Sequence, residues 1–276
     1  MKSTDIAVAT LCVAVALALP ANGQTQIVLY DNFASPSIDP SKWIGAECDS
    51  TSLRDTVRRV VTEESSSSGG LLHLFNKAYA FTNTDSGGTG CPFGLGFPNP
   101  TSIREVSFTV VVERMAAIGC STNASPSIGS VEFRGRFFNT EISPTSVLGD
   151  VESVIGPSRV STDTGNQFTV VAFYTRCDDA NCGARTTLDF RVLGSVYPGE
   201  QSTLRIKWDQ PNHRFVYQLN QQPQVISPYA VSDTSAAVGL FKAIDITHVV
   251  PNCTTAPRPV VTADAYFGNV YTNPQP

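Results

Sequence analysis

The segment YDNFASPSIDPSKW, from Tyr30 to Trp43, places an Asp-Asn-Phe triplet ahead of an Asp-Pro-Ser-Lys-Trp run. It lies a few residues after an apolar leader, close to the start of the expected mature chain. Ser, Thr, Val, Gly and Pro are plentiful in the residues that follow, and this composition favours strands joined by turns over helices. We therefore interpret the segment as the entry into an all-β fold, with Trp43 in its core.

The leader has the pattern of a secretory signal peptide. Lys2 precedes an apolar run from Ile6 to Leu19, and Ala21-Asn22-Gly23 supplies small residues before Gln24. The run is shorter than the roughly 18 to 20 apolar residues of a membrane helix, and no later segment is apolar enough to span a bilayer. The sequence predicts a signal peptide over residues 1–23 and a secreted, extracellular or periplasmic protein.

The charges limit the classes of partner. The formal net charge is −5 and the sequence pI is about 5.2, and the basic residues are scattered rather than clustered. A nucleic-acid partner or an anionic lipid surface therefore has no electrostatic basis in this sequence.

Six cysteines remain after the leader, an even number that indicates disulfides in an exported protein. Only one pair is suggested by proximity: Cys177 and Cys182 in CDDANC are expected to close a hairpin loop. The other pairings stay open. A structural zinc site needs four ligands, and no second cysteine or histidine pair lies near Cys177 and Cys182.

Short alternating segments dominate the rest of the chain. REVSFTVVVERM (104–115) and SVEFRGRFFN (130–139) alternate apolar and polar residues, which is typical of half-buried strands. Phe93 and Phe97, set among Gly and Pro in residues 91–100, are expected to be exposed. We predict a single domain over residues 24–276, with about a dozen antiparallel strands in two packed sheets.

Three separated stretches resemble the concanavalin A-like lectin and glucanase superfamily. They are DNF…IDPSKW (31–43), LRIKWDQPNHRFVYQLNQQP (204–223) and ADAYFGNVY (263–271). The resemblance implies an antiparallel two-sheet jelly-roll sandwich, a fold that includes both laminin G-like modules and laminarinase-type glucanases. It also implies a structural calcium ion near the first and last strands, for which Asp31 and Asp264 are the fitting ligands.

Two groups of charged residues are candidates for a site. Glucanases of this superfamily carry a Glu-x-Asp-x-Glu or Glu-x-Asp-x-x-Glu run on one strand, and no such run occurs here, so we predict no catalytic residue. The nearest approach is Asp150 with Glu152. Glu132, Arg134 and Arg136 alternate along one strand face and could hold sugar hydroxyls or a uronate carboxylate. Cross-strand ion pairing explains the same five residues without a ligand, and we favour it.

Three functions remain open from the sequence. The first is a secreted, non-catalytic module that binds a polysaccharide, another glycan or an extracellular partner. The second is a glycoside hydrolase or polysaccharide lyase with a divergent site around the five charged residues. The third is a structural envelope or matrix protein.

Overall fold

A computed structural model describes residues 26–47, 53–63, 69–140 and 142–274, and for residues 53–57 and 63 it describes the backbone alone. The predicted signal peptide and Cys48 lie outside these ranges. The described residues form sixteen strands and two short 3-10 helices, η1 (Pro100–Ser102) and η2 (Gln210–Asn212). Within them, no helix has the length and apolar character needed to cross a membrane.

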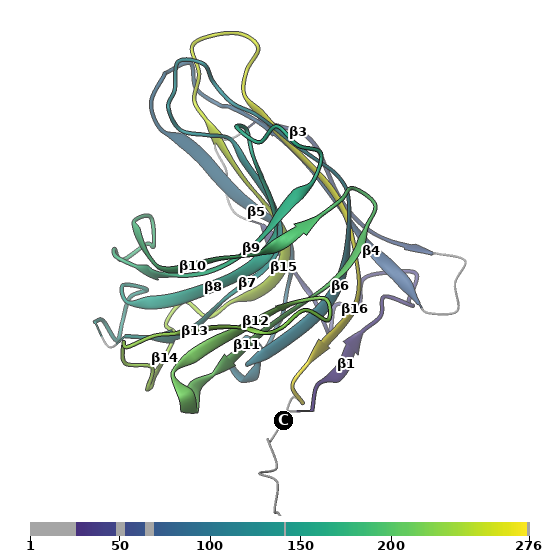
Figure 1. Ribbon diagram of the computed structural model, residues 1–276, viewed down its shortest axis with the longest axis vertical. Coiled ribbons are helices and arrows are strands. Elements are labelled where there is room, and N and C mark those ends of the chain that lie inside the picture. Colours follow the sequence, from purple (N-terminus) through teal and green to yellow (C-terminus); the bar gives the residue numbers. More distant parts are fainter. Residues whose placement is uncertain (1–25, 48–52, 64–68, 141, 275–276) are drawn as a thin grey trace, which may run out of the picture.

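The strands form two antiparallel sheets of eight strands each, packed face to face (Figure 1). Sheet A contains, in spatial order, β13 (Val225–Pro228), β12 (Arg214–Leu219), β11 (Gln201–Asp209), β6 (Glu105–Ile118), β16 (Val260–Thr272), β4 (Gly70–Tyr79) and β3 (Leu53–Glu63), with β1 (Val28–Asp31) paired to β16. Sheet B contains β10 (Arg185–Val196), β9 (Phe168–Cys177), β8 (Asp150–Val160), β7 (Ile128–Asn139), β15 (Lys242–Pro251), β5 (Gly88–Gly96) and β2 (Ile44–Glu47), with β14 (Ser235–Ala236) paired to β7. The predicted all-β, two-sheet antiparallel sandwich is confirmed.

The core lies between the sheets because alternate side chains of each strand point inward. Aromatic residues dominate it: the Phe138 ring stacks on Trp208 at 5.5 Å and contacts Tyr229 at 5.0 Å between ring centroids. Trp43 is 3% exposed and Trp208 is 8% exposed, so both tryptophans pack in the core, as predicted for Trp43.

At one end of the sandwich the core becomes thin. The ends of β4, β5, β15 and β16 and the loops beyond them extend as an arm at the top of Figure 1. Between the sheets here the buried residues are small: Ala78, Ala80, Val250 and Val261. A disulfide joins Cys120, just after β6 of sheet A, to Cys253, just after β15 of sheet B.

The expectation that Phe93 and Phe97 are exposed was wrong. Phe93 is 4% exposed and Phe97 is 2% exposed, and both belong to the main core. The Gly-rich run is strand β5, and a Cβ on Gly94 would lie 2.1 Å from the Ile244 carbonyl oxygen of β15. Glycine allows this close approach, and alternation then directs Phe93 and Leu95 into the core.

Candidate functional site

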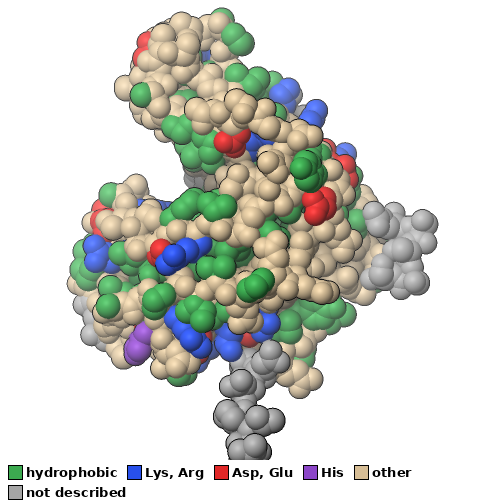
Figure 2. All heavy atoms as spheres, viewed as in Figure 1, with side chains coloured by type: hydrophobic (Ala, Val, Ile, Leu, Met, Phe, Trp, Pro, Cys, Tyr) green, Lys and Arg blue, Asp and Glu red, His purple; other side chains and the backbone are tan. Residues whose placement is uncertain are grey.

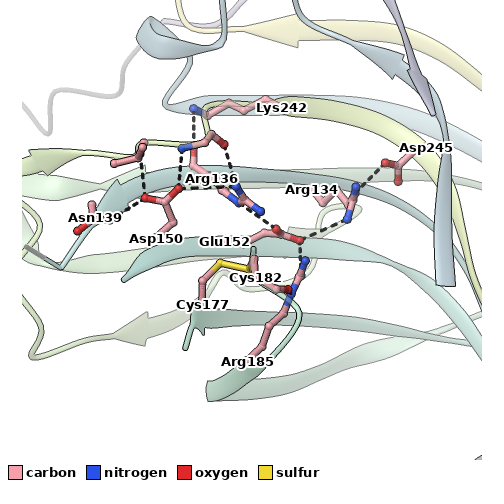
Figure 3. A network of polar contacts seen from close by, with 12 residues as sticks. Arg134, Arg136, Asn139, Asp150, Glu152, Cys177, Cys182, Arg185, Lys242 and Asp245 are labelled. Atoms are coloured by element: carbon pink, nitrogen blue, oxygen red, sulfur yellow. Dashed lines mark hydrogen bonds and ion pairs between the residues drawn. A yellow bond between two sulfur atoms is a disulfide. The ribbon is translucent and has the colours of Figure 1, made fainter. Parts of the chain in front are cut away.

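The five charged residues predicted from the sequence gather on the face of sheet B that points away from sheet A, here called the cleft face. Figure 3 shows Arg134, Arg136, Asp150 and Glu152 among them. Alternation places Glu132, Arg134 and Arg136 of β7 on this face. The neighbouring strand β8 contributes Asp150 and Glu152, with Arg136 opposite Glu152 in the register. Antiparallel pairing therefore brings all five together.

Glu152 is the centre of a cluster of ion pairs. Its Oε1 lies 2.9 Å from Nη1 of Arg185 and 3.5 Å from Nη1 of Arg134, and its Oε2 lies 3.6 Å from Nε of Arg136. Burial alone would raise the pKa of this carboxyl group, but the three guanidinium groups outweigh burial and hold the pKa below its usual range. Glu152 is therefore a buried, ionised carboxylate.

Asp150 binds the protein's own backbone. Its carboxylate accepts hydrogen bonds from the backbone N–H groups of Val238 and Gly239, both at 2.8 Å, and from Asn139 Nδ2 at 2.8 Å. Arg136 Nη1 lies 3.7 Å away, and Asp150 is fully buried. These contacts anchor the segment after β14 to β8 and leave the carboxylate little capacity to bind a ligand.

Arg134 links Glu152 to Asp245 of β15, a residue that the sequence analysis did not single out. Arg134 Nε donates to Asp245 Oδ2 at 2.9 Å, and the guanidinium lies 4.9 Å from the centroid of the Phe241 ring. Burial alone would lower the pKa of Arg134, but the nearby carboxylates of Asp245, Glu152 and Glu132 raise it. Asp245 faces Glu132 across the register, a pairing that depends on a strand far away in sequence.

Glu132 differs from Glu152 in protonation. Its Oε1 accepts a hydrogen bond from Thr247 Oγ1 at 2.8 Å. Burial, and then the charge of Asp245, raise the pKa of Glu132 to about 8, and burial raises the pKa of Asp245 to about 6. At neutral pH Glu132 is therefore mainly a neutral acid, while Glu152 is charged.

A cleft of about 420 Å³ opens over this cluster. Glu132, Arg134, Glu152 and Arg185 line one part of it, and the rest is mostly apolar. The apolar part contains Phe173, Phe190, Val171, Val192 and Val249. Figure 2 shows the surface hollowed on this side of the molecule, between the arm and the lobe of β8 to β10, with hydrophobic side chains along the hollow.

Two residues of the apolar part are strongly exposed. Phe190 on β10 is 55% exposed and Val192 is 61% exposed, and the Phe190 ring stacks on Phe173 of β9 with centroids 6.2 Å apart. Neither ring was predicted: β9 is apolar on both faces, which hides the outward direction of Phe173. Period-two alternation puts Leu188, Phe190 and Val192 on one face, and it is the register shift between Thr187 and Asp189 that turns Leu188 toward the core while Phe190 and Val192 stay exposed.

The predicted disulfide between Cys177 and Cys182 is present, and it helps to position Arg185. The Cys182 carbonyl accepts a hydrogen bond from Arg185 Nε at 3.1 Å, while Nη1 of the same side chain reaches Glu152. Asp179 organises the loop by accepting hydrogen bonds from the backbone N–H groups of Gly183 and Ala184 at 2.9 and 2.6 Å. The disulfide loop thus holds one cation at the edge of the cleft.

Removal of this disulfide is expected to have a moderate effect on stability. The bond joins residues only five apart in sequence, so in the chain-entropy picture the Cys177→Ser/Cys182→Ser variant should lose about 2 kcal/mol of unfolding free energy. Urea unfolding of the variant and of the wild type measures the difference. An unchanged free energy of unfolding would mean that Asp179 alone holds the loop.

The structure does not bring Asp31 and Asp264 together as ligands of one ion. Asp31 lies opposite Val270 of β16, six residues along the strand from Asp264, a separation of roughly 20 Å. Asp31 accepts a hydrogen bond from Trp43 Nε1 at 2.7 Å, and Asp264 pairs with His73 Nε2 at 2.5 Å. The two carboxylates are therefore too far apart to bind the same calcium ion. Calcium at either one remains a prediction.

No protein-family model matches the sequence, and no curated protein matches it at a significant level. Solved structures with a similar fold include the GlcNAcα1-4Gal-releasing endo-β-galactosidase of Clostridium perfringens, at 8% identity and a TM-score of 0.47 over 92% of this chain. The chain spans 64% of that protein's length.

Two further similar structures are a β-glucanase and a glucan hydrolase. The Bacillus licheniformis β-glucanase has 11% identity and a TM-score of 0.40, over 88% of this chain and 97% of its own. A Bacteroides ovatus family 16 glycoside hydrolase from a mixed-linkage glucan locus has 10% identity and a TM-score of 0.44, over 87% of this chain and 97% of its own. At these identities and TM-scores the likenesses establish neither a family nor an activity for this chain.

Proposed function

We propose that this chain is a secreted, non-catalytic carbohydrate-binding protein whose site is the cleft of sheet B. The observation that carries the proposal is the two-sided lining of that cleft, with exposed aromatic and aliphatic side chains beside a floor of fixed charged groups. A sugar ring has the complementary surfaces, because its C–H face is apolar and its hydroxyl edge both donates and accepts hydrogen bonds.

The aromatic part would supply the contact area for the sugar face. Phe190 is 55% exposed and is supported from below by Phe173, so the ring is presented in one orientation at little entropic cost. A ligand that covers it removes apolar surface from water, at about 25 cal/mol for each Å².

The charged floor would supply hydrogen bonds. Arg185 has a 36% exposed side chain and offers guanidinium N–H groups beyond the one that binds Glu152. Glu132 lines the cleft as a neutral acid at pH 7 and can donate as well as accept. Because these groups are held by one another, their positions are set before a ligand arrives, which lowers the cost of binding.

A second candidate is a glycoside hydrolase, and one observation favours it. Glu132 and Glu152 lie on adjacent strands with pKa values moved in opposite directions, the separation expected of an acid and a partner carboxylate. Against this, Glu152 is neutralised by three arginines, which weakens a carboxylate as a nucleophile or base.

One experiment separates these functions. Purified protein is titrated with a panel of soluble polysaccharides by calorimetry, and each mixture is then assayed for new reducing ends. We expect binding to at least one polysaccharide without release of reducing ends, and a loss of affinity of roughly tenfold, or about 1.4 kcal/mol, in Phe190→Ala.

The matched control is Phe81→Ala, because Phe81 is also exposed, at 48%, but does not line the cleft. Equal loss in both variants would reject the cleft as the site. Release of reducing ends that disappears in Glu132→Gln would establish the hydrolase instead. Absence of both binding and hydrolysis would favour a structural matrix role.

A further inference from the structure

A second groove lies at the end of the sandwich opposite the arm, where β1 and the C-terminus are found (Figure 1). It measures about 790 Å³, and it is built from β1, the segment before Trp43 and the loop that joins β5 to β6 through η1. It shares no lining residue with the cleft of sheet B. The residues that matter for its chemistry are Tyr30, Ser41, Lys42, Asn99, Thr101 and Arg104.

The charged side chains that line this groove are both cations. The Lys42 side chain is 40% exposed, and its nearest acid is Asp31 at 3.5 Å, whose side chain is only 9% exposed. Arg104 is exposed, lies 5.5 Å from the centroid of the Trp208 ring, and has no carboxylate within ion-pair distance among the described residues. No Asp or Glu lines the groove. The nearest carboxylates are Asp31, beside Lys42, and Asp39, which accepts hydrogen bonds from Ser41, so the cations belong to the lining and the acids flank it.

A third basic side chain, Lys242, lies next to the loop that forms the groove. Lys242 is buried, and its Nζ donates to the Pro100 carbonyl of η1 at 2.8 Å. Burial, and then the positive charge of Arg104, lower the pKa of Lys242 to about 7. Tyr30 adds no negative charge, because burial raises the pKa of its hydroxyl to about 12 and the hydroxyl donates to the Lys42 carbonyl at 2.5 Å.

The polar groups around the cations are donors suited to an oxyanion. Asn99 precedes η1 but makes no capping hydrogen bond with its side chain, so its amide can turn to a ligand. Guanidinium and ammonium groups form their strongest hydrogen bonds with carboxylate, sulfate or phosphate oxygens. The geometry points to a binding site for an acidic polysaccharide, with Lys42 and Arg104 contacting its sulfate or carboxylate groups.

Other polyanions fit this groove less well. Nucleic-acid binding rests on many phosphate contacts, and membrane association gains only about 1 kcal/mol for each exposed cation near the surface. Two accessible cations on an acidic protein are too few for either. A polysaccharide with spaced anionic groups needs only a pair of cations and a groove to lie in. The inference does not depend on the cleft of sheet B.

Calorimetry with dextran sulfate and with uncharged dextran tests the site directly, because the two polymers share one backbone. We expect the full-length mature protein to bind dextran sulfate and not dextran, with affinity that falls as salt is added. The Lys42→Gln/Arg104→Gln variant should bind at least about tenfold more weakly. Arg104→Gln alone, at an exposed position, provides a variant that is expected to fold normally.

The matched control is Arg176→Gln/Arg191→Gln, which changes the net charge equally but at two arginines already paired with Asp178 and Asp189. We expect less than about a twofold change in its affinity. Equal weakening in both double variants, or equal binding of dextran, would overturn the proposal. Binding to phosphatidylserine vesicles but not to dextran sulfate would also overturn it, in favour of a membrane surface. Phe81→Ala, at an exposed position that lines neither this groove nor the cleft, should leave dextran sulfate binding unchanged.

Discussion

Replacing Arg134 with methionine should lower the free energy of unfolding by about 3 to 5 kcal/mol. Asp245 is fully buried and Glu152 is 1% exposed, and both lose a cationic partner in the variant. Methionine has a similar length and is apolar, so the change removes the charge with little loss of volume. The cost therefore comes from buried carboxylates without compensation, which must lose their charge or admit water.

The control for this prediction is Arg176→Met. Arg176 and Asp178 form an ion pair of similar length, 3.1 Å, but their side chains are 31% and 29% exposed. Such a pair contributes at most about 1 kcal/mol. Urea unfolding of the two variants beside the wild type gives the comparison. If Arg134→Met were no more destabilising than Arg176→Met, water would reach Asp245 and Glu152, and the cluster would not be buried.

Replacing Glu132 with glutamine should remove a pH-dependent loss of stability. The folded-state pKa of about 8 lies above the 4.5 of a free side chain, so between these values the folded protein holds a proton that the unfolded chain has released. The stabilisation is present in full below pH 4.5 and is lost as the pH rises through 8. At about 1.4 kcal/mol for each pH unit, the loss is at most about 5 kcal/mol.

Glutamine keeps the shape and the oxygen that accepts from Thr247, but it cannot ionise. We expect the variant to match the wild type near pH 4.5 and to exceed it in stability above pH 8. Urea unfolding at about pH 5, 7 and 9 measures the difference. Glu113→Gln, at an exposed position on β6, is the control and should show no such divergence.

Two other buried groups also shape the pH profile of the wild type. Asp245, with its pKa raised to about 6, loses stabilisation as pH rises, in the same direction as Glu132. Lys242, with its pKa lowered to about 7, has the opposite sign, because its contribution is lost as pH falls through 7. Both remain in the variant, and because Asp245 and Glu132 act on each other, the difference between the two proteins reports the loss of Glu132 together with its effect on Asp245. Parallel curves for the two proteins would mean that Glu132 is ionised in the fold.

Alternation predicted much of the candidate site. Because side chains alternate along a strand, Glu132, Arg134 and Arg136 were predicted on one face of β7. Asp150 and Glu152 lie on β8, the next strand along the chain. Ion pairs link four of these residues, the arrangement favoured from the sequence. Whether they bind a ligand stays a prediction.

The site also contains a residue, Asp245, that was not predicted because its place depends on the order of the strands in the sheet. β15 pairs with β7 although more than a hundred residues separate them, so the position of Asp245 opposite Glu132 cannot be read from local pattern. A calcium ion shared by both predicted ligands is ruled out for a related reason, and calcium at either one stays a prediction. Asp31 and Asp264 are on paired strands, but the register separates them by six residues.

The disulfide between Cys120 and Cys253 has a consequence for the cleft. Val249 lines the cleft, and β15 reaches the bridge four residues later. The small residues between the sheets of the arm give weak packing, so noncovalent contacts alone would let this wall move with temperature or solvent. The covalent bond fixes it to sheet A. The width available to a ligand is therefore determined when this disulfide forms, before any ligand is present.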